Sequence, residues 1–125
     1  MLRSFIEIPF FYKKWTELGL SDSELKSLQG LLLDNPAAGN IMQGTGGVRK
    51  LRMAIRNRGK SAGIRICYVD FEEYGLIYLL TVYQKKDQEN LSNKEKNEIK
   101  ELVKLLKDEA AKRRKGEECH NYSRN

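Results

Sequence analysis

The stretch LIYLLTVY, residues 76–83, most constrains the fold, because it is almost wholly apolar. A half-buried strand alternates apolar and polar residues, whereas an unbroken apolar run is typical of a central strand covered on both faces. Two further strands are predicted before it. Residues 64–71 are rich in β-branched and aromatic side chains, and residues 48–54 alternate between apolar and basic ones. We expect these three segments to form a meander of neighbouring strands.

The N-terminal third predicts one strand followed by two helices. Residues 2–8 have the apolar pattern of a strand, and residues 10–18 carry apolar side chains at helical spacing, with Gly19 at the helix end. The sequence Ser21-Asp-Ser-Glu24 is a capping box that starts a second helix, which Asn35-Pro36 closes. Two short helices this close together predict a helical hairpin. The glycine-rich residues 37–47 that follow are expected to form a loop.

A long C-terminal helix is predicted after the last strand. Its start is a second capping box, Ser92-Asn-Lys-Glu95, and Gly116 is expected to end it. The fold class is therefore α+β: a small twisted, mostly antiparallel sheet with an N-terminal helical hairpin and a C-terminal helix. We expect a single domain over residues 1–115 and a flexible tail over residues 116–125.

The net positive charge of the chain arises in its middle third. Residues 35–69 contain seven Lys and Arg residues and no Asp or Glu, whereas the whole chain has a net charge of +6. Charge concentrated in this way is a candidate footprint for a polyanion.

Several other classes of protein are not supported by the sequence. No run of about 18 apolar residues occurs that would span a membrane, and the first residues lack the cleavage pattern of a signal peptide. With one histidine and two distant cysteines, Cys67 and Cys119, neither a zinc site nor a disulfide framework is expected. Cys67 lies in an apolar run and is interpreted as a buried hydrophobic residue. We expect a cytoplasmic protein that needs no cofactor.

If the three strands of the meander are neighbours, one end of the sheet gathers basic side chains and a tyrosine. Such a surface could neutralise phosphates, with the Tyr83 ring stacked on an unpaired base. A lysine with a lowered pKa could also act as the base in RNA cleavage by the ribose 2′-OH. The alternatives are a merely solvated basic face and a Tyr83 that only completes the core edge. Composition and pattern leave these possibilities open.

Four segments in order resemble toxins of the RelE/ParE superfamily, with the HigB-like branch of type II toxin–antitoxin systems as the most similar. The segments are FIEIPFFYKKW, GTGGVRKLRMA, RGKSAGIRICY and GLIYLLTVYQKKDQENLSNKEK, which together cover residues 4 to about 110. The resemblance implies a compact α+β fold and a metal-independent endoribonuclease that cuts mRNA in the ribosomal A site. A ParE-like poison of DNA gyrase, without nuclease activity, is the alternative.

The resemblance also implies roles for individual residues. Arg65, in the GxR element, would stabilise the phosphate, and Lys60 is the candidate base, although Arg58 and Lys60 could exchange roles. Tyr83 and Lys85 match the aromatic and basic positions at the end of the last strand. The expected catalytic residues are Lys60, Arg65, Tyr83, Arg58 and Lys85, and the expected RNA-binding residues are Arg49, Lys50, Arg52, Arg56 and Lys86.

The expected partners follow from the same resemblance. They are a cognate antitoxin with a helix-turn-helix, the ribosome and mRNA, with neither a membrane nor a small-molecule cofactor.

Overall fold

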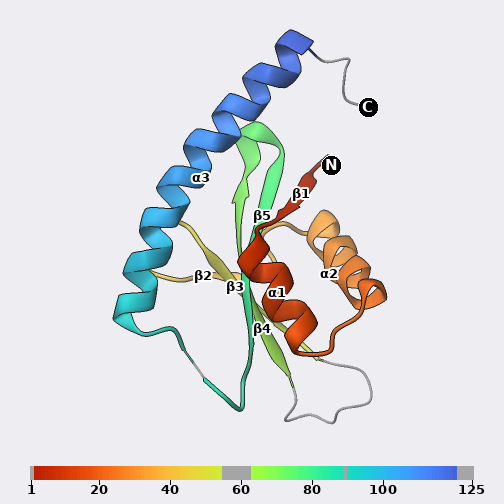
Figure 1. The fold of residues 1–125 in the computed structure, drawn as a ribbon, viewed down its shortest axis with the longest axis vertical. Helices are drawn as coiled ribbons and strands as arrows, with labels where there is room; N and C mark the ends of the chain where they lie inside the picture. Colours follow the sequence, from red (N-terminus) through yellow and green to blue (C-terminus); the bar gives the residue numbers. More distant parts are fainter. Residues whose placement is uncertain (1, 55–62, 89, 121–125) are drawn as a thin grey trace.

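The computed structural model shows a five-stranded sheet with helices on both faces (Figure 1). It describes residues 2–54, 63–88 and 90–120, with side chains as far as residue 113. The strand order is β1-β5-β4-β3-β2. The elements are β1 (Ser4–Glu7), α1 (Pro9–Glu17), α2 (Asp22–Asp34), β2 (Asn40–Ile41), β3 (Arg49–Met53), β4 (Ile64–Phe71), a short 3-10 helix η2 (Glu72–Tyr74), β5 (Leu76–Gln84) and α3 (Asn93–His120).

The predicted meander is confirmed: β3, β4 and β5 are adjacent and antiparallel. The N-terminal strand β1 runs parallel to β5 but pairs only with its first half, from Ser4 opposite Leu76 to Glu7 opposite Leu79. Beyond Leu79 the chain of β1 turns away into α1, and Pro9 occupies the first turn of that helix, where its missing N–H is tolerated. The second half of β5 therefore has no strand beside it on this edge among the described residues.

Both predicted capping boxes are present. The Ser21 hydroxyl accepts a hydrogen bond from the Glu24 N–H, and the Glu24 carboxylate accepts one from the Ser21 N–H. Ser92 and Glu95 repeat this exchange at the start of α3. These contacts satisfy amide groups that the first turn of a helix leaves without partners, which is why the two sequences start helices where they do.

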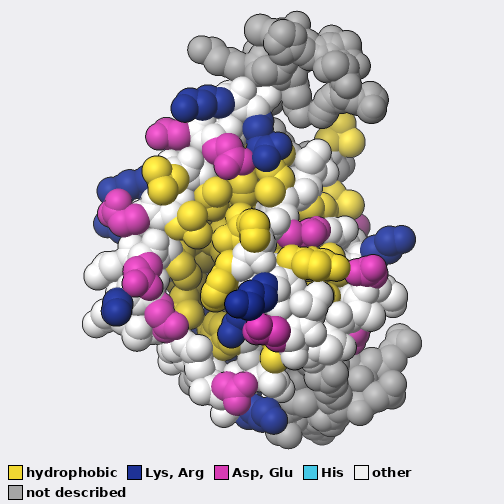
Figure 2. Space-filling model, viewed as in Figure 1, with side chains coloured by type: hydrophobic (Ala, Val, Ile, Leu, Met, Phe, Trp, Pro, Cys, Tyr) yellow, Lys and Arg dark blue, Asp and Glu magenta, His cyan; other side chains and the backbone are white. Residues whose placement is uncertain are grey.

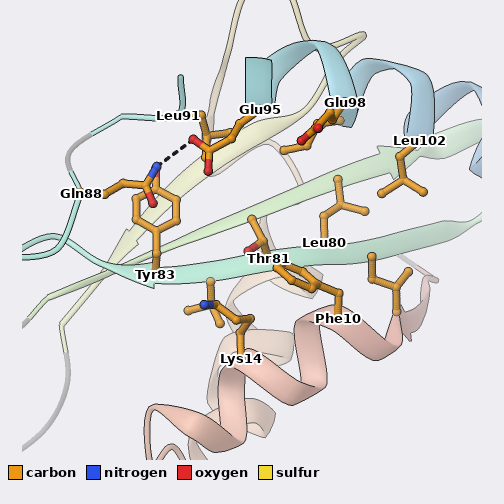
Figure 3. Close-up of a pocket in the computed structure, with 13 residues that line it drawn as sticks. Phe10, Lys14, Leu80, Thr81, Tyr83, Gln88, Leu91, Glu95, Glu98 and Leu102 are labelled. Atoms are coloured by element: carbon orange, nitrogen blue, oxygen red, sulfur yellow. Dashed lines mark hydrogen bonds between the residues drawn. The ribbon is translucent and has the colours of Figure 1, made fainter. Parts of the chain in front are cut away.

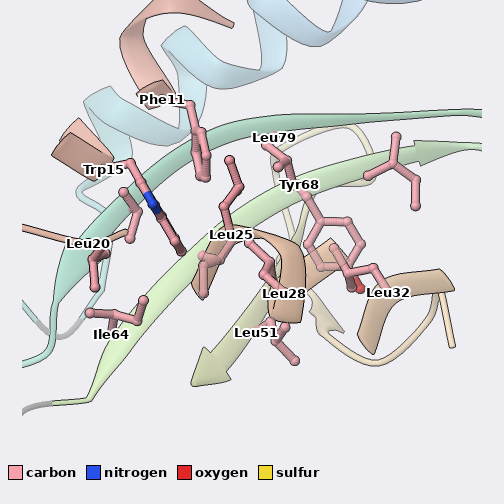
Figure 4. Packing of buried hydrophobic residues seen from close by; sticks show 13 residues of the cluster. Phe11, Trp15, Leu20, Leu25, Leu28, Leu32, Leu51, Ile64, Tyr68 and Leu79 are labelled. Carbon is pink, nitrogen blue, oxygen red and sulfur yellow. The ribbon is translucent and has the colours of Figure 1, made fainter. Parts of the chain in front are cut away.

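The sheet separates two hydrophobic cores. On one face α1 and α2 pack their apolar stripes on β3, β4 and β5, as Figure 4 shows for Trp15, Leu28 and Tyr68. On the other face α3 packs Val103, Leu106 and other residues against the opposite side of the same strands. The near-complete burial of β5 confirms that it is covered on both faces, as its apolar run predicts.

The segment predicted as a loop, residues 37–47, also contributes the short edge strand β2, which the sequence did not reveal. Gly39 brings this segment against β3, because an added Cβ would lie 2.9 Å from the backbone of Lys50. The Tyr68 hydroxyl then accepts a hydrogen bond from the Gly39 N–H at 2.9 Å and donates one to the Pro36 carbonyl at 2.8 Å. A two-residue strand fixed by such contacts leaves no periodic pattern to read.

We expected helix α3 to end at Gly116, but it continues to His120. A glycine inside a helix costs about 1 kcal/mol relative to alanine, which does not stop a helix when good helix formers stand on both sides. The division into a domain of residues 1–115 and a flexible tail of 116–125 stays a prediction. Among the described residues, no helix combines the length and the apolar character that a membrane span requires.

Candidate functional site

Three functional candidates form one row across the sheet. In the strand register, Arg65 of β4 lies directly between Arg52 of β3 and Tyr83 of β5. Side chains that are opposite each other in neighbouring strands project from the same face. We call this set the Arg52–Arg65–Tyr83 row. Three segments distant in sequence therefore bring two guanidinium groups and a tyrosine together, as the sequence led us to expect.

The row lies on the sheet face that α3 covers. Leu51, Ile64 and Val82, which alternate with the row residues along their strands, belong to the core under α1 and α2, whereas Tyr83 belongs to the core under α3. The row is at the end of the sheet that α3 approaches with its N-terminus (Figure 3).

Two members of the row are buried in this structure. For Tyr83 this agrees with the alternative of a residue at the core edge, whereas the sequence gave no indication that Arg65 is buried. Only 5% of Arg65 and 7% of Tyr83 is exposed, whereas Arg52 is exposed. Gln88 and Leu91, from the segment between β5 and α3, lie beside the Tyr83 ring (Figure 3). The Arg65 guanidinium has a long hydrogen bond to the carbonyl of Ile64, at 3.4 Å.

Polar contacts tie the described residues between β5 and α3 to both neighbouring elements. The Lys50 ammonium donates to the Asn90 side chain at 3.0 Å, which ties the segment to β3. Gln88 donates to the Glu95 carboxylate at 3.0 Å. Hydrogen bonds from Ser92 and Gln88 lower the pKa of Glu95, which keeps this group ionised. Leu91 is the buried apolar anchor of the segment.

The remaining basic candidates lie in different places. Lys50 lies two residues before Arg52 on β3, opposite Cys67, and shares the face of the row. Burial raises the pKa of the Cys67 thiol to about 12, so it stays neutral beneath that lysine. Lys85 and Lys86 are exposed just after β5. Arg49 stands apart from the row: it lies opposite Tyr68, and its guanidinium donates to the Gly39 carbonyl at 2.7 Å.

Arg56, Arg58 and Lys60, which the resemblance places at the site, lie outside the described residues. Their roles as RNA ligand, acid or base stay predictions.

The row is suited to bind a phosphate. Arg52 and Arg65 are directly opposite each other, so their side chains start from the same face of neighbouring strands and can approach the same anion. Arginine forms paired hydrogen bonds with phosphate oxygens, and a tyrosine ring at the end of the row offers a surface for base stacking. Among the described residues, no three His, Cys, Asp or Glu side chains gather in a group that could hold a metal ion.

A mainly apolar groove runs beside the row. It has a volume of about 290 Å³ and lies between α1, β5 and α3 (Figures 2 and 3). Phe10 of α1 forms one wall, Leu102 of α3 forms the other, and Leu80 to Tyr83 form the floor. We call it the β5 groove. The sequence predicted β5 but gave no sign that half of its edge would be left open.

Comparison with known proteins adds an independent finding. A family model described as the RelE toxin of the RelE/RelB toxin–antitoxin system matches residues 10–115. The fold is also similar to a solved structure of a mutant of the E. coli toxin RelE in the free state. That match has a TM-score of 0.51 and 20% sequence identity, and it covers 71% of this chain and 90% of the other. At this identity the structural match supports the fold.

The fold and the family match define the class of this protein: it is the toxin of a toxin–antitoxin system. More narrowly, the family model spans most of the sequence, and the chain belongs to the RelE toxin family.

RelE family toxins are ribosome-dependent endoribonucleases that cut mRNA and inhibit translation, and this is the activity of the chain. The predicted function is confirmed, and the gyrase-poison alternative is not favoured. Family membership also implies an antitoxin partner. The HigB-like branch stays a prediction.

Proposed function

We propose that the Arg52–Arg65–Tyr83 row is the surface on which this toxin holds the mRNA phosphate that it cuts. The observation that carries the proposal is the register, which places Arg65 between a second arginine and the tyrosine. Arg65 stabilises the negative charge that develops on the pentavalent phosphorane, and Arg52 binds the same or the adjacent phosphate. Tyr83 stacks on an unpaired base next to the scissile bond.

The reaction we propose is an in-line attack of the ribose 2′-oxygen on the adjacent phosphorus. The bond from phosphorus to the 5′-oxygen breaks, which leaves a 2′,3′-cyclic phosphate and a 5′-hydroxyl. Lys60 takes the proton of the 2′-hydroxyl, and Arg58 stabilises the negative charge that develops on the phosphorane; Arg58 and Lys60 could exchange these roles. Lys85 donates the proton with which the 5′-oxygen leaves as a hydroxyl. These assignments rest on the family resemblance, and no step requires a metal ion.

The wider basic surface orients the mRNA and the ribosomal RNA around it. Lys50 shares the face of the row and Lys86 is exposed just after β5, which supports a role in binding phosphates. Arg56 is proposed for the same role from the sequence. Arg49 is the weakest member of the predicted set, because its guanidinium already donates to a carbonyl away from the row.

Engagement of RNA requires the segment between β5 and α3 to move, since Gln88 and Leu91 lie over Tyr83. We further propose that the protein acts in the cytoplasm, on translating ribosomes, and that its antitoxin carries a helix-turn-helix and belongs to a HigB-like pair.

Primer extension on cellular mRNA after induced expression tests the function. We expect cuts in phase with codons that disappear when translation is blocked before induction. Intact mRNA together with chromosome breaks would instead indicate a gyrase poison and contradict the proposal.

A further inference from the structure

Gly63, the glycine of the GxR element, stands at a position where the backbone conformation does not require a glycine. It is not among the glycines with a positive φ, and its carbonyl accepts a hydrogen bond from the Lys85 N–H at 3.1 Å. That bond continues the pairing of β4 with β5 one residue beyond Ile64, and a residue of any type could make it. What a glycine supplies at this position is therefore space.

The space lies beside the guanidinium of Arg65. Because side chains alternate along a strand, a side chain at position 63 would share the sheet face of Arg65. A Cβ added at Gly63 would lie 3.6 Å from Arg65 Nη1 and 3.6 Å from the Met53 carbonyl oxygen. A methyl group therefore just fits, whereas a longer side chain would have to lie against the guanidinium or displace it. We call this space the Gly63 notch.

The side chain of Arg65 runs toward the notch. Its Nη1 lies near position 63 and donates to the Ile64 carbonyl at 3.4 Å, so the guanidinium lies toward the start of β4. In the other direction along β4, the nearest residue on this face is Cys67, which is fully buried. Across the sheet stand the other two members of the row. Of these neighbours, only Gly63 brings no side chain.

The notch offers a phosphate a route to an arginine that is otherwise covered. Only 5% of Arg65 is exposed, whereas Gly63 is half-buried. Arginine binds phosphate through charge-assisted hydrogen bonds, so a phosphate oxygen has to come within about 2.9 Å of a guanidinium nitrogen. A position without a side chain permits so close an approach to the strand.

We propose that Gly63 is a positioning residue of this toxin, because its missing side chain opens the path by which the mRNA phosphate reaches Arg65. One phosphate oxygen lies in the Gly63 notch and accepts hydrogen bonds from the guanidinium, while Arg52 on the adjacent strand binds the same anion. Gly63 acts only through Arg65. The inference rests on the proposed function, since it takes Arg65 as the residue that stabilises the phosphate.

Gly63→Leu and Gly30→Leu provide a matched pair for the test. Gly30 is exposed on α2, and an added Cβ there would meet nothing within 4 Å. We would measure the affinity for programmed ribosomes and the single-turnover rate of mRNA cleavage. Gly63→Leu should lose about 100-fold in rate, as when one charge-stabilising group is removed, and should keep its ribosome affinity within about twofold. Gly30→Leu should change neither quantity. Cleavage by Gly63→Leu at the wild-type rate would overturn the proposal.

Gly63→Ala keeps the test decisive if circular dichroism shows that Gly63→Leu does not fold. The added methyl group narrows the notch without filling it, so the phosphate is held slightly out of place. We expect the cleavage rate to fall about tenfold, because small displacements of a reacting group are costly. A wild-type rate for folded Gly63→Ala would then overturn the proposal.

A titration with inorganic phosphate separates failure of this inference from failure of the proposed function. The nuclear magnetic resonance signal of the Arg65 Nε–H should shift on addition of phosphate in the wild type and in Gly30→Leu, but not in Gly63→Leu. A shift that is absent from the wild type, or that persists in Gly63→Leu, would exclude the notch as the route. Wild-type cleavage by folded Arg65→Met would instead contradict the proposed function, while the titration would still report whether phosphate reaches Arg65 over Gly63.

Discussion

The contributions of the Tyr83 ring and of its hydroxyl can be tested separately. Its ring ends the Arg52–Arg65–Tyr83 row, and its hydroxyl is buried. If the ring stacks on a base, the hydroxyl contributes little to cleavage. We expect Tyr83→Phe to cut ribosome-bound mRNA within about threefold of the wild-type rate, and Tyr83→Ala to lose at least about 100-fold.

The measurement is the single-turnover rate on programmed ribosomes, with circular dichroism to confirm folding. A Tyr83→Phe variant as inactive as Tyr83→Ala would show that the hydroxyl, rather than the ring, takes part in the reaction.

Cys67 makes the stability of the protein depend on pH in the alkaline range. Burial raises the pKa of the folded thiol to about 12, above its ordinary value near 8.5. The stabilisation that comes from this raised pKa is fully present at any pH below the pKa of the thiol in the unfolded chain. The contribution is lost as pH rises from about 9 toward 12, because only the unfolded state then releases the proton.

We expect the free energy of unfolding to fall by about 1 to 2 kcal/mol between pH 8 and pH 10, by the linkage of pKa to stability. Cys67→Ala should lower stability at pH 8 but remove most of that decline, as urea titrations at several pH values would show. Above pH 10 the buried Tyr78, whose pKa is raised to about 12 by burial and by its hydrogen bond to Glu109, adds a decline of the same sign in both proteins. Parallel curves for the two proteins from pH 8 to pH 10 would contradict the assignment to Cys67.

At the scale of elements, our proposal for the site requires Gln88 and Leu91 to move before RNA reaches Tyr83. A binding-competent state that is only partly populated lowers the apparent affinity in proportion to its population. Leu91→Ala removes the buried anchor of the segment and should raise the open population. We expect a several-fold tighter apparent affinity for ribosomes, despite a stability loss of about 2 to 3 kcal/mol from the cavity.

Lys26→Ala, an exposed substitution on α2, is the control and should change neither quantity. Ribosome binding by Leu91→Ala that weakens in step with its stability would show that the segment supports the site instead of covering it.

Much of the element pattern could be predicted from sequence because its signals are local. The capping boxes at Ser21 and Ser92 and the apolar run of β5 each depend on neighbouring residues only. β2 could not be predicted, because its two residues are fixed by contacts of Gly39 with β3 and Tyr68. The helix end at Gly116 was wrong because a single glycine is a weak stop signal.

The site was predictable to the extent that residue type and alternation determine it. Alternation places Arg52 on the other face of its strand from Leu51, and the meander makes three strands neighbours. The register that aligns Arg65 with Tyr83 depends on how the strands pair over their full length, which no local pattern specifies. The burial of Tyr83 under Leu91 and the open edge of β5 depend on where the chain turns after each strand, and these features became visible only in the structure.

At the scale of the whole molecule, helices cover both faces of the sheet, and the strand register brings Arg52, Arg65 and Tyr83 into one row across it. Family membership assigns ribosome-dependent cleavage of mRNA to this chain, and the row is our proposal for where it happens. Arg65→Met tests that proposal most directly, because methionine keeps an unbranched buried side chain and removes the guanidinium.

The decisive measurement is the rate of mRNA cleavage on programmed ribosomes in a purified translation system. We expect Arg65→Met to lose about 100-fold to 1,000-fold, the usual effect of removing one group that stabilises developing charge. Arg113→Met, on the distant part of α3, should keep the wild-type rate. Cleavage by folded Arg65→Met at the wild-type rate would contradict the assignment of the row as the active site.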